Sequence, residues 1–243
     1  MYKESFKKLV DLAFSKSNSF YANKLNENQP NPYFVGFGNP NAKVLILGKE
    51  KGFDSQNLEQ LKKESVDNPL QWNDFVVKNI AINKEPFYND KTHYTNVSFP
   101  YLGGQKGGHT WSKYQNLLQQ TYPNFEFDIN DFLKFSFISE INPNPSKNSN
   151  INRYKDEDRL SFLSNEFYQS FPITILACGN YLSQKQIETL FGVTFIEDKG
   201  TPRNRFSIYK GQERILINTR QLSMDVSYDY LNKIATEIFP YSV

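Results

Sequence analysis

Cysteine and histidine are scarce in this sequence. Cys178 is the single cysteine among 243 residues, and His93 and His109 are the two histidines. One cysteine excludes an internal disulfide and any cysteine cluster for zinc or an iron–sulfur centre. The two histidines do not have metal-ligand spacing. We therefore expect neither a metal nor another cofactor.

Long apolar runs are also missing. No stretch approaches the roughly 18 consecutive apolar residues that a membrane-spanning helix requires. The first ten residues, MYKESFKKLV, contain no apolar segment of the kind found in secretory signals. We therefore expect a cytoplasmic protein without a membrane partner.

An excess of one charge is the third missing feature. The 28 Lys and Arg residues nearly balance the 26 Asp and Glu residues, which gives a net charge of +2. Such a balance neither demands nor excludes nucleic acid, because a local basic patch is enough to bind phosphates. The length fits one large domain. We predict a single domain over residues 1–243, with residues 1–35 as an N-terminal helical extension, and a monomer.

Apolar runs that end at glycine or asparagine predict the strands. They lie at residues 43–47, 135–139, 173–177 and 214–217, and residues 206–209 are expected to form a hairpin with the last of them. Helical spacing of apolar residues predicts helices at residues 3–15, 110–120, 156–167, 182–191 and 227–239. Strands that alternate with helices predict a three-layer α/β/α fold around a mostly parallel sheet.

The loop after the first strand is a candidate site, because open α/β sheets bind ligands at the carboxyl ends of their strands. Gly48 and Gly52 bracket Lys49, Glu50 and Lys51. Glycine allows the backbone to approach a ligand closely, and flanking lysines favour an ionised Glu50, as a general base or cation stabiliser must be. A tight turn with solvated charges is the alternative.

Two further strand-end loops are polar. Asn142 carries the donors and the acceptor that suit an amide-like base edge, although an Asx turn before Pro143 accounts for it equally well. Arg220 and Ser223 suit contacts with phosphates, and a solvated arginine with a capping serine is the alternative. Leu222 is an apolar residue in a polar loop, where it is either a wedge or a core anchor.

Four segments, taken in order, resemble the uracil-DNA glycosylase superfamily. The run GNPNAKVLILG at 38–48 is similar to the first motif of its iron–sulfur branch. The segment FPYL at 99–102, before the helix that carries Trp111, resembles the proline-containing segment of the best-known branch. The runs ILACGNY at 175–181 and INTRQLS at 217–223 resemble that branch's strand-to-helix turn and its leucine-containing loop.

The resemblance implies an enzyme that flips a base out of DNA and cleaves its glycosidic bond. Glu50 then takes the place of the catalytic aspartate, Asn142 reads the uracil edge, Phe99 stacks on the base and Leu222 fills the gap in the base stack. The site residues that we predict are Glu50 and Asn218 for catalysis, Asn142, Phe99, Gly48 and Lys49 for base binding, and Arg220, Leu222, Ser223 and Lys51 for DNA binding.

The sequence departs from the family at three points. Asn218 stands where the family has a histidine that stabilises charge on the uracil oxygen, and an amide can donate a hydrogen bond but cannot be cationic. Thr219 replaces a proline. Cys178 alone cannot hold the iron–sulfur cluster of the branch that the first motif resembles.

Three functions therefore remain open. The first is an atypical glycosylase that removes uracil or another damaged base from damaged or single-stranded DNA. The second is a non-catalytic nucleic-acid or nucleotide-binding domain of the same fold. The third is an unrelated α/β nucleotide-binding or hydrolase domain that shares only the strand-end glycine.

Overall fold

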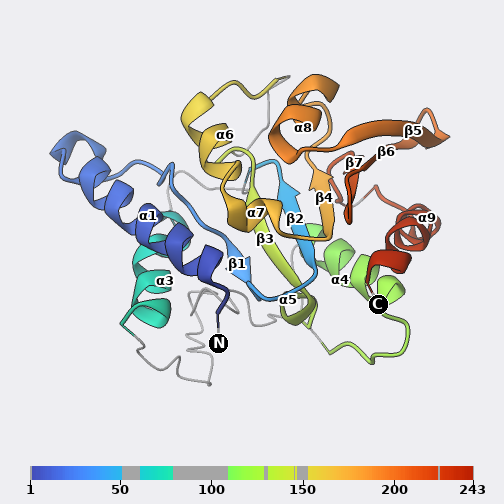
Figure 1. Cartoon of the computed structure of the whole chain (residues 1–243), viewed down its shortest axis with the longest axis horizontal. Coiled ribbons are helices and arrows are strands. Elements are labelled where there is room, and N and C mark those ends of the chain that lie inside the picture. Colours follow the sequence, from blue (N-terminus) through green and yellow to red (C-terminus); the bar gives the residue numbers. More distant parts are fainter. Residues whose placement is uncertain are drawn as a thin grey trace.

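A seven-stranded sheet forms the centre of the computed structural model (Figure 1). The structure describes residues 2–50, 61–78, 109–128, 131–144, 146, 153–223 and 225–242. The strand order within them is β1-β3-β2-β4-β7-β6-β5. The strands are β1 (Phe37–Gly38), β2 (Val44–Gly48), β3 (Ser136–Glu140), β4 (Ile173–Ala177), β5 (Thr194–Thr201), β6 (Asn204–Lys210) and β7 (Ile215–Thr219).

The four central strands, β3, β2, β4 and β7, are parallel to one another. Their residues are almost all buried, as expected for strands covered on both faces. The antiparallel pairing of β6 with β7 confirms the predicted hairpin. Two antiparallel edge strands, β1 and β5, were not predicted. β1 has only two residues, and β5 is largely exposed, so neither carries a strong apolar pattern.

Helices cover both faces of this sheet. Figure 1 shows α1 and α3 on one side of it and α4 and α9 on the other, which makes three layers. The α-helices are α1 (Glu4–Tyr21), α3 (Asn68–Val76), α4 (His109–Thr121), α5 (Phe132–Phe135), α6 (Glu157–Leu163), α7 (Glu166–Gln169), α8 (Gln184–Phe191) and α9 (Tyr228–Ile238). Short helical turns of other types lie at Lys24–Asn26, Lys62–Val66 and Phe239–Tyr241. None of the helices in the described ranges is long and apolar enough to cross a bilayer.

The helix predicted at 156–167 is divided into α6 and α7. The break falls at Ser164 and Asn165, and the Asn165 side chain accepts a hydrogen bond from the backbone N–H of Phe167 at 3.0 Å. An asparagine that caps a helix in this way competes with continuation of the preceding one. The apolar spacing continues across the break, so periodicity alone did not reveal it.

The N-terminal helix is part of the central core and not an appendage to it. Phe6 of α1 is fully buried. Its ring centroid lies 4.9 Å from that of Trp72 in α3 and 5.7 Å from that of Phe137 in β3. The same hydrophobic cluster extends to Ile238 at the end of α9. The segment expected as an extension therefore helps to cover one face of the sheet.

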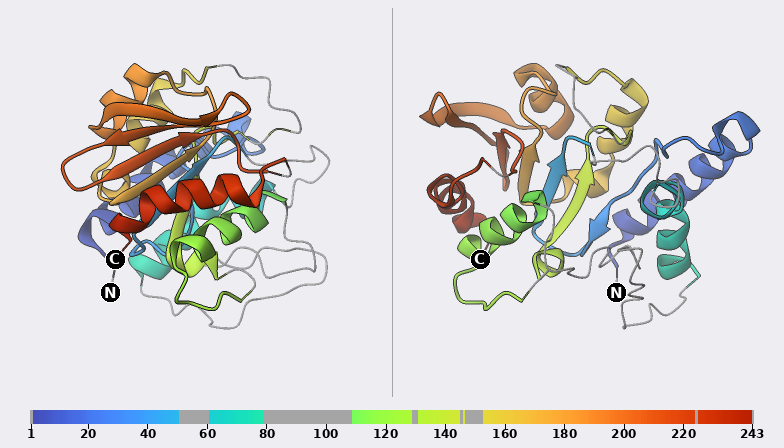
Figure 2. Two further views of the ribbon diagram at one scale, coloured as in Figure 1. Left: turned by 90° about the vertical axis from the view of Figure 1, so that its right-hand side faces the viewer. Right: turned by 180° about the vertical axis from the view of Figure 1, so that it is seen from behind.

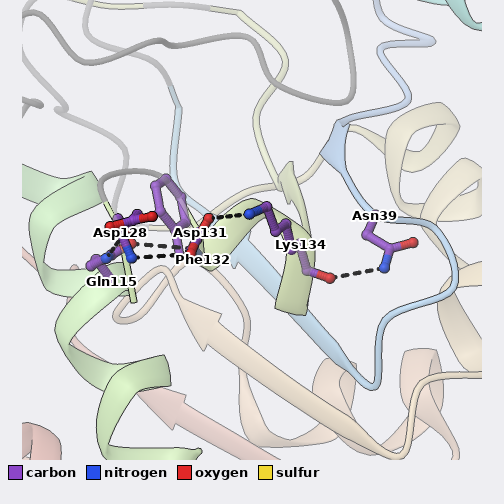
Figure 3. A network of polar contacts seen from close by, with 6 residues as sticks. All are labelled: Asn39, Gln115, Asp128, Asp131, Phe132 and Lys134. Atoms are coloured by element: carbon purple, nitrogen blue, oxygen red, sulfur yellow. Dashed lines mark hydrogen bonds and ion pairs between the residues drawn. The ribbon is translucent and has the colours of Figure 1, made fainter. Parts of the chain in front are cut away.

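A polar network fastens the amino end of β3 to its surroundings (Figure 3). Gln115 of α4 accepts a hydrogen bond from the backbone N–H of Phe132 at 3.2 Å. The carbonyl of Lys134 accepts the side-chain amide of Asn39 at 2.8 Å, and the Lys134 ammonium lies 2.6 Å from Asp131. These contacts hold α5 between α4 and the loop before β2, and so fix where β3 begins.

The order of the parallel strands locates a crevice. Numbered along the chain, the four parallel strands lie in the order second, first, third, fourth. The chain therefore leaves β2 toward β3 on one side and returns to β4 on the other. In open α/β sheets, a ligand crevice forms outside the carboxyl ends of the strands at such a switch point. Here it falls between the loops after Gly48 and after Ala177.

Candidate functional site

Glu50 is the centre of a polar cluster at this switch point. The residue follows β2 and is half-buried. Its Oε2 accepts a hydrogen bond from the Tyr181 hydroxyl and another from Nδ2 of Asn142 at 3.4 Å. Tyr181 comes from the loop after β4, and Asn142 from the loop after β3. Three strand-end loops thus meet at one carboxylate.

Backbone pairing beyond the strand ends sets this geometry. The N–H of Ile141 donates to the carbonyl of Gly48 at 2.9 Å, and the N–H of Asn142 donates to that of Lys49 at 2.8 Å. Oδ1 of Asn142 accepts the N–H of Asn144 at 3.0 Å, which is the Asx turn that the sequence predicts as the alternative. Asn142 is therefore both a turn residue and a partner of Glu50. Its side chain is 3% exposed, so the turn holds it in a fixed position.

A buried arginine supports the same loop. Arg159 of α6 is 1% exposed, and it donates to the carbonyl of Glu140 at 2.6 Å and to the carbonyl of Phe34 at 2.7 Å. It also donates to the Ser139 hydroxyl at 3.1 Å. Burial lowers the pKa of Arg159 from its ordinary value. Its hydrogen bonds lock the end of β3 two residues before Asn142.

Lys49 and Gly48 line the other side of the cluster. The Lys49 ammonium lies 5.0 Å from the centroid of the Tyr181 ring, within the range of a cation–π contact. Gly48 is buried, and a Cβ added there would lie 3.3 Å from the hydroxyl of Tyr114 in α4. Lys49 therefore places a positive charge next to the tyrosine that binds Glu50.

Cys178 lies beneath this loop as a core residue. It is fully buried, and burial raises the pKa of its thiol to about 12. The thiol therefore stays protonated and is a poor nucleophile at neutral pH. No group of three or more His, Cys, Asp or Glu side chains in the described part of the chain is placed to hold a metal ion.

Asn218 and Arg220 lie in a different place from the Glu50 cluster. Both line a pocket of about 540 Å³ between the loop after β4, the carboxyl end of β7 and the β5–β6 hairpin. Glu50, Asn142 and Gly48 are not among the residues that line it. Oδ1 of Asn218 is buried and accepts no hydrogen bond from any described residue. The predicted pair of catalytic residues is therefore divided between two neighbouring sites.

The predicted residues of the loop after β7 differ in burial. Leu222 is fully buried, so it is a core anchor in this conformation. A wedge role would require it to leave the core. Ser223 is half-buried, and its carbonyl accepts the N–H of Val226 at 3.1 Å. Arg220 lies 3.8 Å from Asp225, a loose pair at the surface.

Two predicted site residues, Phe99 and Lys51, lie outside the described residues. Tyr181 and three arginines of the pocket, Arg153, Arg203 and Arg205, were not among the predicted site residues. Tyr181 stands within a strand-end loop that the fold rule marks for inspection. The arginines carry no such signal, because the β5–β6 hairpin brings in Arg203 and Arg205 and tertiary contacts with the loop after β4 bring in Arg153.

Comparison of the sequence with protein-family models finds no match, and comparison with curated proteins finds no significant match.

Proposed function

We propose that the chain is a divergent uracil-DNA glycosylase-like enzyme that hydrolyses the N-glycosidic bond of uracil or another damaged base in DNA. The observation that carries the proposal is the half-buried Glu50 carboxylate at the switch point, bound by Tyr181 and Asn142. A carboxylate that is fixed in position can stabilise a positively charged sugar and orient a water molecule.

The two carboxylate oxygens of Glu50 have different roles in the proposed reaction. Both hydrogen bonds that described residues donate to Glu50 end on Oε2, so we assign Oε1 to the attacking water. As the bond from C1′ to the base breaks, the base leaves with the electron pair. Water adds to C1′ and gives its proton to the carboxylate, which passes that proton to the departed anionic base and is itself regenerated. The products are a free base and an abasic site.

Asn142 has the capacity to read a base. Within the described part of the chain, it uses one amide hydrogen on Glu50 and accepts one hydrogen bond from Asn144. A side-chain amide has two donor hydrogens and two acceptor lone pairs. One donor and one acceptor are thus left for the edge of a pyrimidine, next to the carboxylate that acts on its glycosidic bond.

A binding domain without catalysis is the second candidate. It is favoured by the position of Asn218, which lines the separate pocket instead of the Glu50 cluster. An enzyme of the proposed kind benefits from a donor at the uracil oxygen, where charge develops. Without Asn218 at the cluster, that donor must come from elsewhere.

A cleavage assay separates the two functions. End-labelled single strands and duplexes that carry uracil, hypoxanthine or a thymine mismatch are incubated with the protein and then treated with alkali, which breaks the strand at abasic sites. We expect product on at least one substrate. Glu50→Gln should reduce its rate at least about 100-fold, because loss of a positioned acid–base group costs 10²–10⁴.

Glu213→Gln is the matched control, since it makes the same chemical change at an exposed position. Glu213 lies just before the amino end of β7, whereas Glu50 follows the carboxyl end of β2. It should cleave at the rate of the parent. If no substrate yields product while binding to DNA persists and weakens with salt, the protein is a binding domain.

A further inference from the structure

The pocket that contains Asn218 is lined by four arginines. They come from separate parts of the chain: Arg153 lies before α6, Arg203 is in the turn of the β5–β6 hairpin, Arg205 is in β6 and Arg220 follows β7. Among the described residues, the lining has one carboxylate, that of Asp198. The pocket therefore carries a strong excess of positive charge in a chain whose total charge is nearly balanced.

The sheet register places two of these arginines at the same end of the β6–β7 pair. Phe206 of β6 is paired with Thr219 at the end of β7, so Arg205 and Arg220 are the residues directly beyond this last pair. Like charges that line one pocket repel each other. Each has a carboxylate nearby, but only loosely, at 3.6 Å for Arg205 with Asp198 and 3.8 Å for Arg220 with Asp225. An anion between the two arginines would relieve the repulsion.

The backbone that carries these arginines is anchored. The Tyr230 hydroxyl of α9 donates to the carbonyl of Arg205 at 3.0 Å and also bonds the Thr219 hydroxyl. Arg153 donates to the carbonyl of Leu182 at 3.2 Å and to that of Asn180. Arg205 therefore stands on anchored backbone, and the guanidinium of Arg153 is itself held against the loop after β4.

The pocket and the Glu50 cluster share one wall. Asn180 and Leu182 line the pocket, whereas Tyr181 between them binds Glu50. The N–H of Gly179 donates to the carbonyl of Thr219 at 2.9 Å, which fixes this loop against the end of β7. The pocket and the carboxylate therefore lie against the same short segment of chain, residues 180–182.

We propose that this arginine pocket binds phosphodiester groups of a nucleic acid strand that continues to Glu50. The proposal rests on the proposed function only for the source of the phosphate. Arginine forks match phosphate oxygens, and Asn180, Asn218 and Ser207 add neutral hydrogen-bonding groups. The pocket is open, with 64% of the Arg205 side chain and 37% of the Arg220 side chain exposed. This suits a strand that lies across the pocket better than a small ligand enclosed by it.

Binding is measured by fluorescence anisotropy with undamaged labelled oligonucleotides, single-stranded and duplex, in the Glu50→Gln background. Catalysis therefore plays no part. Arg205→Ala and Arg220→Ala should each weaken binding about tenfold, since a charged hydrogen bond contributes about 1.5 kcal/mol or more. Each should also reduce the slope of log K against log salt by about 0.7–0.9.

Lys8→Ala/Lys24→Ala is the charge-matched control for the double variant Arg205→Ala/Arg220→Ala. Both lysines are exposed and lie on the N-terminal elements, away from the hairpin (Figures 1 and 2). The control should bind like the parent. Equal losses in the control and in the arginine variant would overturn the proposal, and so would unchanged binding by the arginine variant.

A second arm of the experiment identifies the source of the phosphate. Inorganic phosphate and a deoxynucleoside monophosphate are titrated as ligands. If the arginine changes abolish their binding but leave the oligonucleotide affinity unchanged, the pocket holds a free nucleotide and the strand assignment is wrong.

Failure of the two proposals is distinguishable. If the arginine variants lose DNA binding and the parent protein cleaves no substrate, the pocket proposal stands and the glycosylase proposal is wrong. If cleavage depends on Glu50 but the arginine variants bind DNA as the parent does, only the pocket proposal is wrong.

Discussion

At Glu50, side chains from two other loops converge on one carboxylate oxygen. Tyr181 contributes a hydroxyl, and its ring also stacks on Tyr154 with centroids 6.3 Å apart and lies beneath Lys49. The hydroxyl and the ring therefore have separable roles. The hydroxyl orients the carboxylate, and the ring fills the space between the loop and the core.

Tyr181→Phe tests the role of the hydroxyl. The change keeps the ring and removes the donor, so kcat/KM for base excision should fall about tenfold or more, because a hydrogen bond to a charged group contributes about 1.5–3 kcal/mol. Steady-state kinetics on the best substrate measure it. Tyr154→Phe removes a hydroxyl from the stacked neighbour and should leave kcat/KM near that of the parent. Equal effects of both changes would argue against a role for the Tyr181 hydroxyl.

Single residues differed in how well the sequence predicted them. The role of Glu50 was predictable from sequence, because a buried strand that ends in glycine marks the loop after it as a candidate site. The role of Tyr181 was not predictable, although its loop was a candidate, because that role depends on a partner 131 residues away in sequence. Leu222 was ambiguous from sequence, since an apolar side chain in a polar loop fits both a wedge and a core position. Burial decides in favour of the core in this structure.

Among the elements, the β5–β6 hairpin matters most for the candidate site. It extends outward from the sheet beside α8 and carries two of the pocket arginines (Figure 2). Its turn requires a glycine: Gly200 has a φ of +95°, and an added Cβ would lie 2.0 Å from the carbonyl oxygen of Asn204. The position of Arg203 and Arg205 therefore depends on one residue without a side chain.

Gly200→Ala should destabilise the protein more than Gly192→Ala. Gly192, at the end of α8, has a φ of +60° with open space around it, so alanine there should cost only about 1–2 kcal/mol of conformational energy. At Gly200 the clash adds about 1–3 kcal/mol. Urea unfolding compares the two. Gly200→Ala should also weaken DNA binding, whereas Gly192→Ala should not. Equal stabilities would show that the turn adjusts to a side chain.

The elements of the sheet centre were predictable, and those of its edges were not. The strand predicted at 173–177 matches β4, and the other parallel strands are displaced by one or two residues at their ends. A strand buried on both faces is mostly apolar, and this gives a nearly continuous signal. An exposed edge strand such as β5 gives none, because its pairing depends on β6 and not on its own composition.

At the scale of the whole molecule, burial keeps several acidic groups protonated in the core. It raises the pKa of the Cys178 thiol to about 12 and that of the Tyr168 hydroxyl to about 12. In the unfolded chain these groups lose their protons at lower pH. Above that pH the native state binds more protons than the unfolded state, so stability falls as pH rises.

The free energy of unfolding should therefore fall between about pH 9 and pH 12. One group with a raised pKa contributes a slope of about 1.4 kcal/mol per pH unit in its window. Urea unfolding at pH 8, 9, 10 and 11 measures this slope. Cys178→Ala removes one titrating group and should make it shallower. A stability that stays constant up to pH 11 would contradict the assignment of these groups as buried and neutral.

Arg159 has a consequence for how this sequence can evolve. Apart from the Ser139 hydroxyl, its hydrogen-bond acceptors are backbone carbonyls, those of residues 32, 34 and 140. Every amino acid supplies a carbonyl, so substitutions at those three positions leave these acceptors in place. The side chain at position 159 therefore holds the end of β3, and the side chains at positions 32, 34 and 140 can change without loss of these hydrogen bonds. Two relatives can thus keep the same loop geometry around Glu50 and yet retain little recognisable similarity beside it.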